Sequence, residues 1–198
     1  MKLTYLSLPA LALAGPLALQ QRQSSAQVLS MTATGEGCPP GSFSTLIDEH
    51  GISAKASFDV FGIVAGQNVP VLNKSLACDV AVTVTFPGTC KQAVMRTRTD
   101  AFVLVAMDAG ATAKVSTQFS VSGGVSGGSP PDLVYTSVAG ENTSVDIGRG
   151  YEVSISATGQ TATFVAHLEI YLDAPVAEFA SQTVLDGFGL ALSQEGLC

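Results

Sequence analysis

The chain has 198 residues, a formal net charge of −7 at pH 7 and only 13% charged residues. Phosphate backbones and anionic membrane surfaces repel such an acidic chain, so nucleic acid is excluded as an expected partner. Valine, alanine, threonine, serine and glycine are abundant and tryptophan is absent, a composition typical of extracellular β proteins. Removal of an N-terminal leader peptide, described below, would leave about 175 residues, enough for one domain but not for two.

Residues 1–18 predict a secretory signal peptide. A basic start precedes an apolar run at 6–19 that ends among small residues suited to cleavage. The run is roughly 14 residues long, too short to span a bilayer. A propeptide ending at Arg22 is an alternative cleavage product, which leaves residues 23–198 as one mature domain. We therefore expect a secreted, extracellular protein with no membrane span.

Alternating apolar and polar residues predict β-strands along the mature chain. Val80, Val82 and Val84 would face the core while the residues between them face solvent, and the same period recurs at 153–157 and 162–172. Further β-rich runs occur at 28–34, 53–64, 101–107, 113–121, 133–138 and 185–192. Turn formers separate the runs at 35–41, 66–70, 87–88, 108–110, 122–132 and 148–150. The pattern predicts a single all-β, antiparallel, disulfide-stabilised β-sandwich.

The four cysteines Cys38, Cys78, Cys90 and Cys198 predict two disulfides, with three possible pairings. A tight hairpin of residues 78–86 and 91–98 would hold Cys78 and Cys90 roughly 20 Å apart, so a bond between them needs a wide loop. We favour Cys38 with Cys198, which closes the ends of the domain, and hence Cys78 with Cys90.

Two N-glycosylation sequons lie in segments rich in turn formers. They are Asn73-Lys74-Ser75 and Asn142-Thr143-Ser144. In an exported protein each asparagine is a candidate glycan acceptor on a surface loop.

His167 and Glu169 would project from the same face of one strand. Together with His50 or a loop aspartate they are the candidate metal ligands of the sequence. A metal site needs three or four converging ligands, and a polar strand face explains this pair without one. We therefore expect no metal and no cofactor.

Two further patterns raise catalytic alternatives. Residues 124–128 match G-x-S-x-G, and Asp146 and His167 follow in hydrolase order, but Ser129-Pro130-Pro131 prevents the helix that a nucleophile elbow requires. Glycosidases need two converging carboxylates, and the sequence selects no pair among Asp48, Glu49, Asp59, Asp79, Asp100 and Asp108. Recognition of sugars by flat aromatic platforms is disfavoured without tryptophan, whereas recognition through loops and hydroxyls remains open.

A series of short motifs resembles a known family. Gly35-Glu36-Gly37-Cys38-Pro39-Pro40-Gly41-Ser42 leads into Phe58-Asp59-Val60-Phe61, then Ala77-Cys78, Phe86-Pro87-Gly88, residues 108–113 and a terminal Cys198. This order resembles a family of secreted, mostly fungal proteins known as domain of unknown function 4360. The resemblance covers residues 35–198 and implies secretion and a β-rich domain, with no established activity.

These observations favour a non-enzymatic extracellular binding protein. Export, disulfides and a hydroxyl-rich surface indicate a partner such as a cell-wall polysaccharide or a host protein. The alternative is a cell-wall-active hydrolase, or a metal-dependent enzyme built around His167 and Glu169.

Overall fold

The computed structural model describes residues 26–65, 75–87, 92–105, 111–121, 131–136, 143–156, 160–173 and 181–193. These residues form eleven strands: β1 (Gln27–Thr34), β2 (Phe43–Ile47), β3 (Ser53–Phe58), β4 (Gly62–Ala65), β5 (Ser75–Thr85), β6 (Gln92–Val105), β7 (Thr112–Val121), β8 (Leu133–Thr136), β9 (Thr143–Ser156), β10 (Thr161–Asp173) and β11 (Ser181–Ser193). This part of the chain contains no helix of the length and apolarity that a membrane crossing requires.

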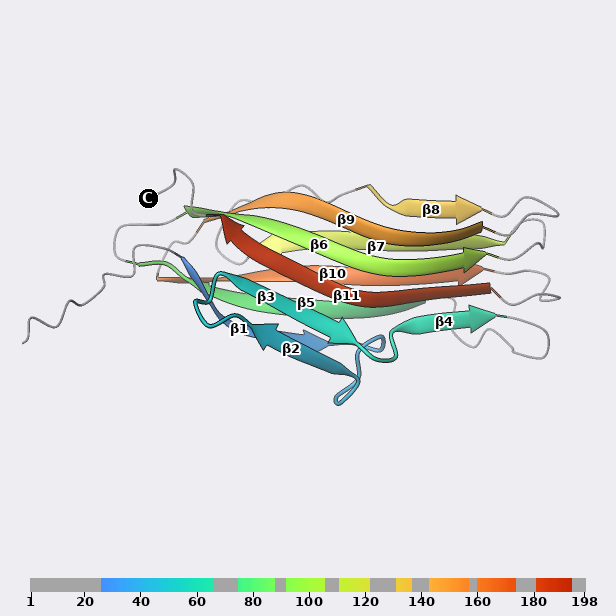
Figure 1. Cartoon of the computed structure of the whole chain (residues 1–198), viewed down its shortest axis with the longest axis horizontal. Helices are drawn as coiled ribbons and strands as arrows, with labels where there is room; N and C mark the ends of the chain where they lie inside the picture. The colour runs from blue at the N-terminus through green and yellow to red at the C-terminus, as the bar shows by residue number, and fades with distance from the viewer. Residues whose placement is uncertain are drawn as a thin grey trace, which may run out of the picture.

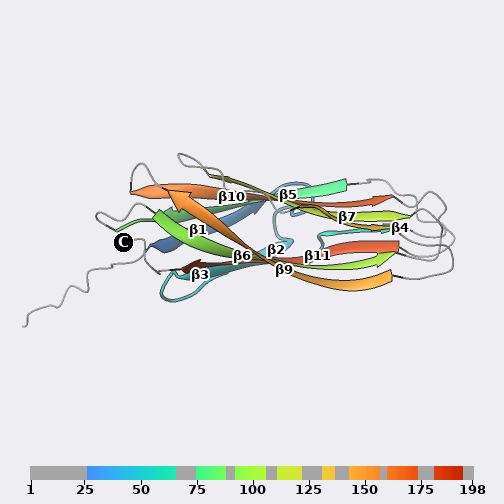
Figure 2. The same cartoon turned by 90° about the horizontal axis from the view of Figure 1, so that it is seen from above.

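The strands form two antiparallel sheets that pack face to face (Figures 1 and 2). Sheet I has the order β1-β5-β10-β7-β8, and sheet II has the order β2-β3-β11-β6-β9, with β4 paired to the first part of β11. The predicted all-β antiparallel sandwich is therefore confirmed.

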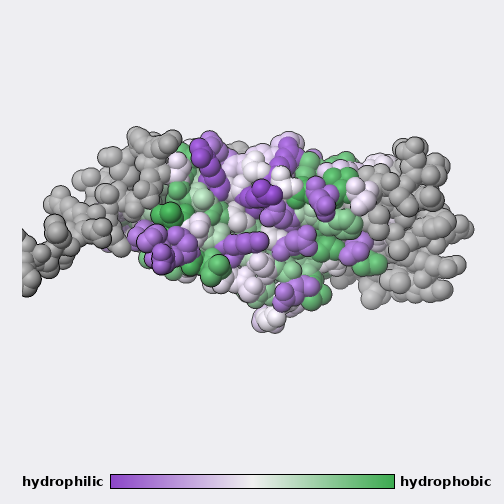
Figure 3. All heavy atoms as spheres, in the orientation of Figure 1, coloured by the Kyte–Doolittle hydropathy of each residue, from purple (hydrophilic) through white to green (hydrophobic). Residues whose placement is uncertain are grey.

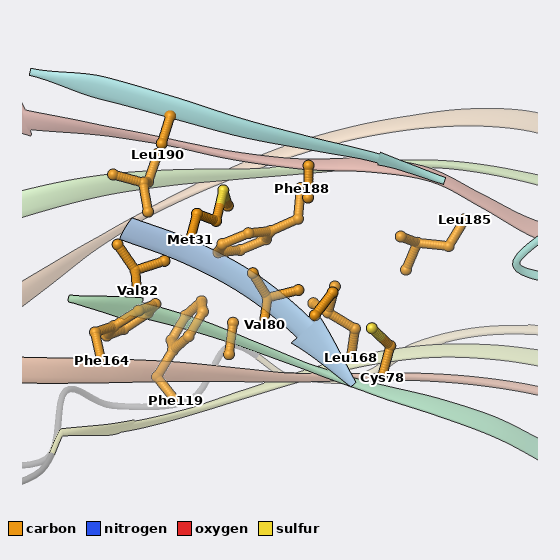
Figure 4. Close-up of a cluster of buried hydrophobic side chains, with 14 of the residues drawn as sticks. Met31, Cys78, Val80, Val82, Phe119, Phe164, Leu168, Leu185, Phe188 and Leu190 are labelled. Carbon is orange, nitrogen blue, oxygen red and sulfur yellow. The ribbon is translucent and has the colours of Figure 1, made fainter. Parts of the chain in front are cut away.

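The core lies between the sheets and follows the predicted alternation. Val80 and Val82 of β5 are fully buried, as are Leu168 of β10 and Phe188 of β11 (Figure 4). Val84 of β5 is also fully buried. Five of the phenylalanines in the strands or their flanks are also buried: Phe58, Phe61, Phe86, Phe119 and Phe164. Because both sheets contribute these side chains, the apolar area that drives folding is shared across the two layers.

Four details of the strand pattern differ from the sequence prediction. Strand β2 is not among the predicted runs, and residues 148–150 lie within β9 and not in a turn. The described parts of the runs at 91–98 and 101–107 belong to one strand, β6. Strand β5 lies in sheet I and β6 in sheet II, so the two do not form the tight hairpin considered above.

The disulfide pairing differs from the favoured one. Cys38 is bonded to Cys78, with their Cα atoms 5.6 Å apart, so the pairings Cys38–Cys198 and Cys78–Cys90 are wrong. The chain after β1 turns back onto β5, and the Gly37 N–H donates to the Ala77 carbonyl at 2.9 Å. A Cβ at Gly35, whose φ is 144°, would overlap the same carbonyl. The glycines of the Gly-x-Gly-Cys motif thus allow the close approach that joins the two cysteines.

A β-bulge divides β11. The register of β11 with β6 shifts between Leu185 and Gly187, so that Leu185 and Phe188 are both fully buried although they are three residues apart. Beyond the bulge, large side chains point into the core at 188, 190 and 192, and small residues occupy the alternate positions. Gly187 is buried beside the Lys55 side chain, whereas Gly189 and Ala191 are at least partly exposed. The outer face of β11 is consequently recessed between its neighbouring strands, because it carries no large side chains there.

Several predicted features lie outside the described residues. They are the signal peptide and the propeptide boundary, the sequon asparagines Asn73 and Asn142, Cys90, Cys198, and the G-x-S-x-G segment.

Candidate binding groove

A groove of about 390 Å³ crosses the outer face of sheet II. We call it the β11 groove; it is lined by Leu46, Asp48, Ser53, Ala54, Lys55, Arg96, Thr97, Arg98, Gly189, Leu190 and Ala191. These residues come from four neighbouring strands and the turn after β2, with β11 as the floor. The same face is turned to the viewer in Figures 1 and 3, where hydrophilic side chains stand among paler residues.

The floor is open because Gly189 has no side chain. Its φ lies outside the left-handed region, and a Cβ placed there would have its nearest contact, the Ala54 carbonyl oxygen, at 3.9 Å. Neither backbone conformation nor crowding therefore requires glycine at this position. Glycine weakens the interior of a strand and often marks a place where another molecule approaches the backbone. The absence of a side chain at Gly189 therefore opens the groove.

The walls of the groove stand in register on either side of the floor. Gly189 pairs with Lys55 of β3 on one side and with Arg98 of β6 on the other. Lys55 in turn pairs with Leu46 of β2, whose side chain is 73% exposed. Two strand spacings separate β3 from β6, so the walls are roughly 10 Å apart at the backbone. That width suits a chain of small rings or an extended polymer.

The walls of the groove carry cations together with neighbouring carboxylates. Lys55, Arg96 and Arg98 are three of the five basic residues in the described part of the chain. The Nε of Arg96 donates to Glu152 Oε1 and the Nε of Arg98 to Asp100 Oδ1, each at 2.7 Å. Glu152 lies opposite Arg96 on β9, and the Arg98 guanidinium lies over Gly148 of β9, so both arginines extend away from the floor strand β11.

Asp48 is the acidic residue of the lining, and its carboxylate supports the turn between β2 and β3. Its Oδ1 accepts the Ser53 N–H at 2.6 Å and its Oδ2 the His50 N–H at 3.3 Å. The Ser53 hydrogen bond is the main reason that the pKa of Asp48 is lowered from its ordinary value of 3.8. Asp48 therefore shapes the end of the groove through the turn.

The lowered pKa predicts a pH-dependent contribution to stability. A carboxyl group with a depressed pKa in the folded state stabilises the fold above its unfolded-state pKa and loses that effect as the pH falls through the folded-state value. We expect the wild type to lose more stability than Asp48→Asn between about pH 5 and pH 2, because asparagine does not titrate. Urea unfolding midpoints of both proteins at several pH values measure the difference, and parallel pH profiles would contradict it.

The predicted site residue His167 lies on the opposite face of the molecule. Its neighbours Ala166 and Leu168 are fully buried, so the imidazole projects from the outer face of sheet I. His167 Nδ1 is 2.6 Å from Asp79 Oδ1 of β5, directly opposite in the register. The pair borders a depression of about 200 Å³ next to the disulfide, which includes Glu36. The histidine and the aspartate hold β10 and β5 together on this face.

Among the residues it describes, the structure neither assembles a metal site around His167 and Glu169 nor brings Asp146 to His167. Glu169 shares the outer face with His167 but pairs with Ala77 and Ser116, and no group of three or more His, Cys, Asp or Glu in the described ranges could hold a metal ion. Asp146 is exposed on β9 of sheet II, whereas His167 belongs to sheet I. The hydrolase order of the sequence therefore corresponds to no shared site.

Sequence reasoning missed every residue of the groove except Asp48, which was considered only as a glycosidase carboxylate. One signal was present in Gly187-Phe188-Gly189-Leu190-Ala191-Leu192, where glycine or alanine alternates with large apolar residues. Such alternation predicts a strand with a full core face and an empty outer face. The basic residues of Arg96-Thr97-Arg98 show the same period of two.

Comparison with known proteins identifies a family and two distant structures. A family model described as Domain of unknown function (DUF4360) matches residues 24–186, and no curated protein matches the chain. The structure of TmCBM61 in complex with beta-1,4-galactotriose is 9% identical, covering 84% of this chain and 91% of that one, with a TM-score of 0.28. The enzymatically active domain of tailspike protein 4 of bacteriophage CBA120 is 9% identical, covering 82% and 18%, with a TM-score of 0.22. Both TM-scores are too low to carry an argument about function.

Proposed function

The chain belongs to the family described as Domain of unknown function (DUF4360), and we propose that it is a non-enzymatic extracellular protein that binds a polymer in the β11 groove. The main support for this proposal is the presence of glycine at position 189, in the middle of a central strand, where neither backbone strain nor crowding requires it. Its effect is to leave room for a ligand between Lys55 and Arg98.

A cell-wall polysaccharide suits this groove better than a folded protein partner. The walls rise on both sides of a floor one strand wide, a shape that admits a narrow chain and excludes a broad convex surface. Hydroxyl and ammonium groups from Ser53 and Lys55 can donate hydrogen bonds to sugar oxygens, and Leu46 offers apolar contact to the C–H face of a ring.

Filling the floor tests the proposal directly. We expect Gly189→Thr to abolish most binding, because the new side chain occupies the groove, while stability stays equal or rises by up to about 1 kcal/mol since threonine favours strands. Glucan, chitin and plant-wall polymers are the probes, in pull-down and calorimetric titrations. Thermal unfolding of the variant shows that the fold is retained.

Gly150→Thr is the matched control. Gly150 pairs with Arg98 on the side away from Gly189, and a Cβ there would meet its nearest contact at 3.5 Å. The control should bind like the wild type. Equal binding by Gly189→Thr and the wild type would remove the groove as the site, and release of soluble products from a bound polymer would overturn the non-enzymatic proposal.

A further inference from the structure

The charges in and beside the β11 groove cancel, and this indicates the chemical class of the ligand. We propose that the groove selects an uncharged polysaccharide and discriminates against chains that carry carboxylate or ammonium groups, an inference that rests on the function proposed above. Three cations and three carboxylates line or flank the groove, whereas the whole chain has a formal charge of −7. A locally neutral site on an acidic protein offers no net attraction to an anion. The six residues are Lys55, Arg96, Arg98, Asp48, Asp100 and Glu152.

Both arginines already have a carboxylate partner from the protein. Arg96 Nε is 2.7 Å from Glu152 Oε1. Arg98 Nε is 2.7 Å from Asp100 Oδ1, and its guanidinium lies over Gly148 of β9, away from the floor strand. An anionic ligand above β11 would have to draw the guanidinium groups out of these pairs. It would exchange one exposed ion pair for another, which brings little net gain.

The carboxylate at the end of the groove is also engaged. Asp48 accepts the N–H of Ser53 at 2.6 Å and the N–H of His50 at 3.3 Å. These hydrogen bonds support the turn between β2 and β3. A cationic ligand would compete with them, so Asp48 is better suited to its role in the turn than to binding an ammonium group.

The surface left for a ligand is apolar and narrow. Gly189 and Ala191 form the open floor, and Leu46 beside it is 73% exposed. The Lys55 side chain leans along the groove, since its Cε is 3.3 Å from the position that a Cβ at Gly187 would take. Its methylene stem therefore covers one end of the floor with apolar surface. Uncharged sugar rings have C–H faces that can pack on such a surface, while their hydroxyls reach polar groups at the rim.

An extended peptide is a poorer fit to the same groove. Peptides commonly bind to sheets by adding a strand to an exposed edge. The floor strand β11 has no such edge along the groove, because its backbone pairs with β3 on one side and with β6 on the other. A sugar chain needs no backbone pairing.

The experiment compares soluble polymers that share a backbone and differ in charge. Hydroxyethyl cellulose is neutral, carboxymethyl cellulose is anionic and quaternary-ammonium cellulose is cationic. Chitin hexasaccharide and its deacetylated form repeat the comparison on a second backbone. Titration calorimetry of the full chain measures each, and groove binding is the part that Gly189→Thr abolishes. We expect a neutral form to bind, and the charged forms of the same backbone to bind at least about tenfold more weakly, because their charges would be desolvated without a partner. Salt should leave binding of the neutral form unchanged.

Matched variants test the charge balance itself. Asp100→Asn keeps the size of the side chain and removes one negative charge beside the groove, so the charges no longer cancel. Carboxymethyl cellulose should bind this variant about two- to fivefold more tightly than the wild type, with hydroxyethyl cellulose unchanged. Asp132→Asn is the control, because it removes the carboxylate that pairs with Lys114 at 3.3 Å on sheet I. A gain in both variants, or in neither, would overturn the role of charge balance.

The remaining outcomes separate this inference from the proposed function. Groove binding of a charged form as tight as that of its neutral form would overturn the uncharged class and leave the groove as a polymer site. Absence of binding by both hydroxyethyl cellulose and chitin hexasaccharide would also overturn it, and the proposed function would survive only if another wall polymer still bound in a manner abolished by Gly189→Thr. If no polymer binds, both proposals fail.

Discussion

Loss of the Cys38–Cys78 disulfide is expected to lower the free energy of unfolding by about 4 kcal/mol. The bond joins residues 40 positions apart in the sequence, and a closed loop of that length restricts the unfolded chain by roughly this amount. In a domain of this size the melting temperature should fall by roughly 8–16 °C. The double variant Cys38→Ala, Cys78→Ala, compared with the wild type by chemical and thermal denaturation, measures the effect.

Peptide mapping without reduction checks the pairing itself. Cys38 and Cys78 should appear in one linked peptide pair. Cys90 and Cys198 then have only each other as partners within the chain. Within the described residues, Ser193 at the end of β11 pairs with Val94 near the start of β6. A linked pair containing Cys38 with Cys90 or Cys198 would contradict the observed topology.

Phe188→Ala should cost about 3–5 kcal/mol, the usual penalty for removing a fully buried phenylalanine. Phe188 is completely buried at the centre of the cluster in Figure 4, between side chains from both sheets. Truncation to alanine leaves a cavity that the facing β-strands cannot easily close. Such a loss is a large fraction of the stability of an ordinary domain. Phe188→Leu should therefore be measured as a second variant, and we expect it to lose less stability than Phe188→Ala.

Leu46→Ala is the control for this prediction. Leu46 is apolar as well, but it is exposed on the outer face, so its truncation should change stability by no more than about 0.5 kcal/mol. Similar losses in Phe188→Ala and Leu46→Ala would contradict the assignment of core and surface along sheet II.

The fold was largely predictable from the sequence because burial alternates along the strands. Val80, Val82 and Val84 predicted the core face of β5 correctly. The first half of β9 was missed because Gly148 and Gly150 are turn formers by composition, whereas here they are outward residues of a strand beside Arg98. At Gly148 the Arg98 guanidinium lies where a Cβ would be, at 2.6 Å from Nη2.

The groove and the disulfide were not predictable because both depend on which strands are neighbours. Lys55, Arg98 and Gly189 are far apart in the sequence and meet only through the register of three strands. Cys38 reaches Cys78 because the chain after β1 returns to β5 in the same sheet. Local periodicity predicts which face a residue occupies and carries no information about its cross-strand partner.

The bulge at Asp186 has a consequence for the whole second half of β11. Strand positions alternate between two faces, so an uninterrupted strand with Leu185 in the core would also turn Gly187, Gly189 and Ala191 inward and send Phe188 and Leu190 to the surface. The bulge reverses this phase, so that Phe188 and Leu190 stay in the core and Gly189 and Ala191 face outward. The bulge thus keeps the large side chains in the core and the floor of the groove free of them. Deletion of Asp186 should give a regular strand with the same two faces, because Leu185, Gly187 and Phe188 would then alternate without an extra residue.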